Sequence, residues 1–150
     1  MNNEKPNVEG QYKTMIIIWA ALLMSQVMFV VMLVFTKPNL FKFDFSKPVA
    51  GASGPMVLGF AVAAVTAVLF SFAFRKRLNQ RAVAAQDTGQ VQSALIIALA
   101  LCEASSLFGL TLAFAFDYQY FFLWFILGVL GMILHFPRRE HLHAAAYQSR

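Results

Sequence analysis

Residues 94–116 read ALIIALALCEASSLFGLTLAFAF, an unbroken apolar stretch with one charged residue, Glu103, near its centre. A helix needs about 20 predominantly apolar residues to cross the hydrocarbon core of a bilayer. This stretch is long enough, so it predicts a membrane-spanning helix. A charged carboxylate at the centre of a bilayer costs about 2.5–3.5 kcal/mol, so Glu103 is expected to have a partner or a purpose.

The composition of the whole chain supports a membrane protein. Of its 150 residues, 59% are hydrophobic and 13% are charged, whereas soluble domains carry about 25% charged residues. The formal net charge is +5, and the basic residues stand beside apolar segments. This pattern indicates contact with the membrane surface rather than with nucleic acid. The single cysteine, Cys102, excludes an internal disulfide and is interpreted as a small packing residue.

Four segments have the length and composition of membrane spans, at about residues 14–35, 55–74, 92–116 and 120–136. The predicted fold class is therefore an all-α integral membrane protein, with one four-helix transmembrane domain over residues 1–150. The first segment is longer than the apolar core of a signal peptide, about 7–15 residues, and we expect it to be retained. The short connection at 117–119 requires the third and fourth helices to be antiparallel.

The distribution of basic residues predicts the orientation. Lys37, Lys42 and Lys47 lie on one side, and the other nine of the twelve Lys and Arg residues lie on the side of both termini. The positive-inside rule then places both termini in the cytoplasm, and we expect a multi-pass protein of a bacterial inner membrane. The residues expected at the membrane interfaces, by charge or by aromatic character, are Arg75, Lys76, Arg77, Trp124, Arg138 and Arg139.

Small residues recur at helical spacing in the second and third segments. Such rows let helix backbones approach closely in lipid, so we expect these two helices to pack tightly, together or against copies of themselves. Glu103 lies on a different face of its helix, which it shares with Ser106. That face must meet a further helix, a neighbouring subunit or a bound cation. The rows are Gly59, Ala63, Ala67 and Ser71 in the second segment, and Ala94, Ala98, Cys102, Ser105, Gly109 and Ala113 in the third.

No Lys or Arg lies inside a predicted span, so Glu103 has no permanent counter-ion in its own chain. Loss of hydration disfavours a charged carboxylate, and we expect Glu103 to be protonated at rest and able to exchange its proton. Gln26, near the middle of the first span, should lie at a similar depth and is a candidate hydrogen-bond partner. The alternative is that Gln26 packs against another helix. The candidate ion-binding residues are thus Glu103, Gln26 and Ser106.

The segment around Glu103 resembles the carboxylate-bearing helix of the rotary ATP synthase c subunit, the proteolipid of the ion-carrying ring. The similar part is about residues 81–116: a polar, Arg-containing loop, then Ala-Leu-Cys-Glu-Ala at 100–104 and Gly109-Leu110 six residues after the glutamate. The resemblance implies that Glu103 is a proton-binding carboxylate. It also implies a proton rather than sodium, because Ala104 stands where sodium-binding members carry a hydroxyl.

Two functions remain open on the sequence. The first is a reversible proton site at Glu103 in a subunit that translocates ions. The second is a structural or accessory subunit of a larger membrane complex with a neutral, hydrogen-bonded Glu103. The spacing of residues around Glu103, similar to that of the c subunit, favours the first function. The second helix lacks the alternating glycines of the family, and two further helices flank the similar hairpin, which favours the second function. Either function fits a homo-oligomer or a subunit of a larger complex.

No enzymatic site is predicted. The sequence offers no nucleophile beside a base, no phosphate-binding loop and no paired carboxylates, so we expect a protein that is not an enzyme and has no cofactor. His135, His141 and His143 suggest a metal site by type, but Arg138 and Arg139 beside them disfavour a cation. We therefore interpret these histidines as part of a solvated tail next to the membrane and predict no metal.

Overall fold

The computed structural model describes residues 7–44, 46, 48–49 and 54–147, and these contain helices and no strand. The all-α fold class is therefore confirmed. The first and longest predicted connection, between the first two long helices, contains a short 3-10 helix, η1. The elements are α1 (Val8–Thr36), η1 (Pro38–Phe41), α2 (Gly54–Ala85), α3 (Thr88–Phe116), α4 (Phe122–Leu134) and α5 (Arg139–Ala146).

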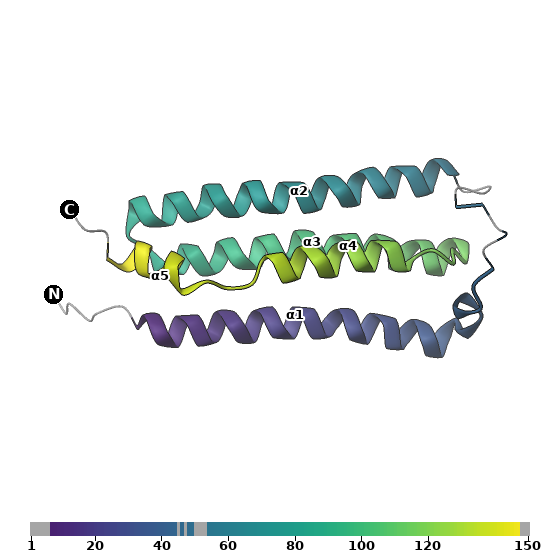
Figure 1. The fold of residues 1–150 in the computed structure, drawn as a ribbon, viewed down its shortest axis with the longest axis horizontal. Coiled ribbons are helices and arrows are strands. Elements are labelled where there is room, and N and C mark those ends of the chain that lie inside the picture. Colours follow the sequence, from purple (N-terminus) through teal and green to yellow (C-terminus); the bar gives the residue numbers. More distant parts are fainter. Residues whose placement is uncertain (1–6, 45, 47, 50–53, 148–150) are drawn as a thin grey trace.

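The long helices lie side by side in an elongated bundle, with the described N- and C-terminal ends at the same end of it (Figure 1). By length and composition α1, α2 and α3 are able to cross a membrane. The helices α4 and α5 add a fourth crossing if this pair, bent by 47°, is one broken span. The structure thus supports a membrane protein with three or four spans. The cytoplasmic orientation of the termini stays a prediction.

The central helix of the bundle is α3, which packs against α2, α4 and α1. Every member of its predicted row of small residues is buried, from Ala94 to Ala113. Close packing needs small side chains where backbones meet, since lipid supplies no hydrophobic force that would hold two helices together. The predicted helix-packing residues Ala98, Ser105 and Gly109 are accordingly buried where α3 meets its neighbours.

The predicted row on α2 is only partly correct. Ser71 is buried, but Ala63 and Ala67 are half-buried and Gly59 is exposed, with no atom within 4 Å of a Cβ added to it. The helix instead buries a neighbouring face, whose residues follow one another at helical intervals of seven, four and three positions. The residues of that face are Val57, Ala64, Val68 and Ser71, with Ala82 farther along.

The seam between α3 and α4 is closed by glycines on both helices. A Cβ on Gly109 would lie 2.8 Å from the carbonyl oxygen of Phe121, and a Cβ on Gly128 would lie 2.8 Å from that of Cys102. A Cβ on Gly131 would lie 2.7 Å from Cys102 Sγ. These distances are too short for a real side chain, so α4 can lie on α3 only because glycine occupies these positions.

The aromatic segment before α4 forms part of the core of the bundle. Trp124 is 6% exposed and packs in a cluster that also contains Tyr118 and Phe121. The connection from α1 closes over this end, where the Gln119 amide donates to the carbonyl oxygen of Asp44 over 2.6 Å. This connection and the neighbouring helices cover Trp124, so its side chain packs inside the bundle, and its place at a membrane interface stays a prediction.

Candidate functional site

Glu103 meets α1 at Ser25, near the middle of both helices. The Ser25 hydroxyl oxygen lies 2.7 Å from Glu103 Oε1 and also 2.7 Å from the carbonyl oxygen of Leu22, one turn earlier in α1. The Glu103 side chain is half-buried between the two helices. The sequence left a further helix, a neighbouring subunit or a bound cation open for this face, and in the structure it meets a helix, α1.

The two contacts of Ser25 allow two hydrogen-bond arrangements. A serine hydroxyl has one hydrogen to donate and can also accept. If Glu103 is protonated, its carboxyl group donates to Ser25 and the Ser25 hydroxyl donates to Leu22. If Glu103 is ionised, the Ser25 hydroxyl donates to the carboxylate. The same side-chain positions therefore accommodate both protonation states of the carboxyl group.

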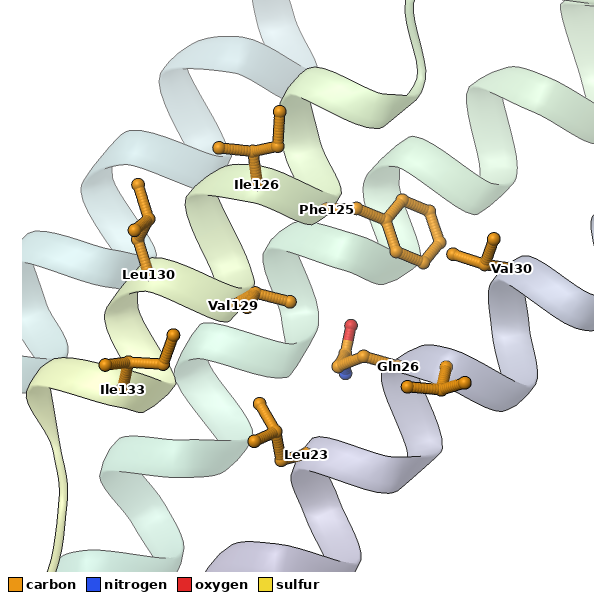
Figure 2. A pocket seen from close by; sticks show the side chains of 9 residues that line it. Leu23, Gln26, Val30, Phe125, Ile126, Val129, Leu130 and Ile133 are labelled. Carbon is orange, nitrogen blue, oxygen red and sulfur yellow. The ribbon is translucent and has the colours of Figure 1, made fainter. Parts of the chain in front are cut away.

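Gln26 does not bond to Glu103, contrary to the candidate pairing. It is 2% exposed, and neither its amide oxygen nor its amide nitrogen has a hydrogen-bond partner among the described residues. Successive residues of a helix point about 100° apart, so when Ser25 faces α3, Gln26 must face elsewhere. Its amide reaches into a cavity of about 650 Å³ between α1 and α4, whose other lining side chains are apolar (Figure 2).

Ser106 is also separated from Glu103. It is fully buried in the seam with α4, where its hydroxyl oxygen lies 2.5 Å from the position of a Cβ on Gly128. The structure therefore directs the three predicted ion-binding side chains to three places. Ser25 takes the role expected of Gln26. Ser25 is adjacent to Gln26 in the sequence and equally central in the span, so its hydroxyl could have been predicted as a partner of Glu103.

A second buried polar cluster lies near the opposite end of α4 from Trp124. His135 is 1% exposed, with its Nε2 2.7 Å from the Ser71 hydroxyl oxygen and its Nδ1 3.1 Å from Arg75 Nη1. A guanidinium group only donates hydrogen bonds, so Nδ1 accepts and the imidazole is neutral, with its hydrogen on Nε2. Ser71 in turn donates to the carbonyl oxygen of Val68 over 2.6 Å.

This cluster corrects the interpretation of the C-terminal histidines. His135 is not part of a solvated tail, because it joins α4 to α2 inside the bundle. The residues that follow form α5, whose Leu142 and Ala145 are buried, while His143 is exposed. The spacing of Ser71 and Arg75, four residues apart on one face of α2, was the available signal for two polar groups aimed at one partner. Among the described residues no group of His, Cys, Asp and Glu is arranged to hold a metal ion.

No family model, curated protein or solved structure matches this chain. The resemblance to the c subunit of the rotary ATP synthase thus rests on the residues around Glu103 alone.

Proposed function

We propose that this protein is a small, non-catalytic membrane protein in which Glu103 reversibly binds a proton within the membrane. The observation that carries the proposal is the position of the Ser25 hydroxyl, 2.7 Å from Glu103 Oε1 and 2.7 Å from the Leu22 carbonyl oxygen. A hydroxyl stabilises the protonated carboxyl as an acceptor and the carboxylate as a donor. A lysine or arginine partner would instead hold the carboxyl in its charged form.

The surroundings of Glu103 favour a proton over a metal cation. A proton needs one acceptor, whereas hard cations such as Ca²⁺ and Mg²⁺ take six or more oxygen ligands. Ser25 is the one side-chain hydrogen-bond partner of Glu103 among the described residues. Lys37 and Arg75, which lie toward the two ends of the bundle, bond to Asp117 and to His135. Neither serves as its counter-ion.

A second candidate function is a structural or accessory subunit of a membrane complex, with Glu103 permanently protonated. It is favoured by the packing of α3. The small residues that would let copies of a c subunit approach one another in a ring are covered here by α2 and α4 of the same chain. In this function the Glu103–Ser25 hydrogen bond holds α1 to α3, since α1 otherwise buries only Val8, Met15, Gln26 and Leu33.

Labelling with dicyclohexylcarbodiimide, which attacks protonated carboxyl groups reachable from lipid, tests the proposal. We expect Glu103 in the reconstituted protein to be labelled at mildly acidic pH and progressively less as the pH rises. Glu103→Gln should abolish the label and keep the fold, because the glutamine amide can still donate to Ser25. Labelling that does not change with pH would favour the accessory function. No labelling at any pH would contradict the proton-site function, because a carboxyl that exchanges a proton within the membrane should be reached by the reagent in its protonated form.

The same hydrogen bond has an expected effect on stability. Ser25→Ala should lower the free energy of unfolding by about 0.6–2 kcal/mol, the usual worth of an interhelical hydrogen bond in a membrane. Thermal unfolding in mild detergent measures the change. Thr66→Ala on α2 is a control, because Thr66 is exposed and should change the stability little. Equal stability of Ser25→Ala and the unaltered protein would show that Ser25 does not hold α1 to α3.

A further inference from the structure

A cationic pocket lies at the end of the bundle where α4 bends into α5. It has a volume of about 340 Å³, and its polar lining includes Arg75, Lys76 and Asn79 of α2 with Arg138 at the bend. Its apolar rim includes Phe72 and Leu134. This pocket is separate from Glu103 and has no part in the proposed proton site.

Among the described residues no carboxylate lines this pocket. The ion pairs formed by the described residues join Lys37 to Asp117 and Arg139 to Glu9, and neither pair neutralises the pocket. His141, which lies on α5 beyond the predicted span, also lines it. Burial lowers the pKa of His141, and the positive charges of Arg75 and Arg138 lower it further, against the opposing charge of Glu140, which does not line the pocket. The pocket therefore has an unbalanced positive potential that favours an anion.

The pocket is already organised for a ligand. The Arg75 guanidinium is held in place because Nη1 bonds to His135 over 3.1 Å and Nη2 donates to the carbonyl oxygen of Phe136 over 3.3 Å. The side-chain oxygen of Asn79 is buried and has no hydrogen-bond partner among the described residues. Arg138 forms no ion pair with another described residue. The site thus combines an anchored guanidinium group, Arg75, with a second one, Arg138, whose charge is not neutralised by a described carboxylate.

We propose that this pocket binds the phosphate group of an anionic membrane lipid. Guanidinium and ammonium groups match phosphate oxygens in charge and geometry, and basic pockets between helices at a membrane surface are suited to lipid headgroups. Leu134 is 67% exposed and Phe72 is 39% exposed at the rim, where acyl chains would lie. Free phosphate shares the headgroup chemistry but does not use this rim.

Lipid binding to the full chain in mild detergent tests the proposal. We expect phosphatidylglycerol added in mixed micelles to bind in preference to phosphatidylcholine, as measured by native mass spectrometry. Arg138→Gln should weaken that binding about tenfold, because one charge-assisted contact to phosphate is lost. Arg77→Gln is the matched control: it removes the same charge from the same end of α2, but Arg77 does not line the pocket.

The outcomes of the lipid-binding experiment distinguish a specific pocket from general attraction to surface charge. Weaker binding in Arg138→Gln and Lys76→Gln, with unchanged binding in Arg77→Gln, supports the pocket. Equal weakening by all three substitutions would overturn it, because the membrane attraction would then be a general effect of surface charge. A second arm adds inorganic phosphate. Displacement of phosphatidylglycerol by inorganic phosphate at low concentration would keep the phosphate chemistry and overturn the lipid as its source.

Discussion

Replacing Gly128 with alanine is expected to destabilise the bundle by about 1–3 kcal/mol or more, the usual cost of overpacking a closely packed site. The added Cβ would lie 2.5 Å from Ser106 Oγ and 2.8 Å from the carbonyl oxygen of Cys102. The serine can rotate away, but the carbonyl belongs to the backbone of α3 and cannot. The two helices must therefore separate, which weakens the whole α3–α4 seam. Thermal unfolding in mild detergent, followed by circular dichroism, measures the loss.

Gly59→Ala is the matched control, and its expected effect has the opposite sign. A Cβ on Gly59 would meet no atom within 4 Å, and alanine is favoured over glycine in a helix by about 0.8–1.0 kcal/mol in water. The same chemical change should thus stabilise one helix and disrupt the contact of another. Equal stability of Gly128→Ala and Gly59→Ala would show that α4 does not pack on α3 as described.

Replacing His135 with leucine is the second change with a large expected effect. The imidazole is buried, bonds to Ser71 and Arg75, and lies over Phe72 with ring centroids 4.3 Å apart. Leucine would leave Arg75 with the Phe136 carbonyl as its one remaining partner among the described residues. A partly buried donor without its acceptor costs about 1–3 kcal/mol. We expect a loss of that order in the free energy of unfolding.

A double-mutant cycle with Ser71→Ala tests the origin of this loss. Because Ser71 and His135 are directly bonded, the two substitutions together should cost less than the sum of the single effects. His143→Leu is the control, since His143 is exposed on α5 and should change the stability little. Additive effects of the Ser71 and His135 substitutions would contradict the described hydrogen bond.

Several features of the fold follow from local properties of the sequence. The apolar stretches and their lengths are enough to predict α1, α2 and α3, since backbone groups in lipid must bond within their own segment. The small-residue row of α3, including Ala98 and Gly109, was also predictable, because the central helix of the bundle meets neighbours on most of its faces. The row of small residues on α2 could not be predicted in the same way, because α2 is peripheral and only one face of it meets α3. Gly59 therefore fits the pattern and yet lies on an open face.

The site shows the same division between what local sequence determines and what packing determines. The sequence by itself placed Glu103 at mid-span without a counter-ion, and it left a further helix, a neighbouring subunit or a bound cation open for the face of that carboxylate. Only the tertiary structure decided that the partner is Ser25 and not Gln26, that Ser106 faces α4, and that His135 is buried against Arg75. The physical reason is rotation: adjacent helix residues point about 100° apart. The angle of each helix about its own axis is set by the packing of all its neighbours together, which no single segment contains.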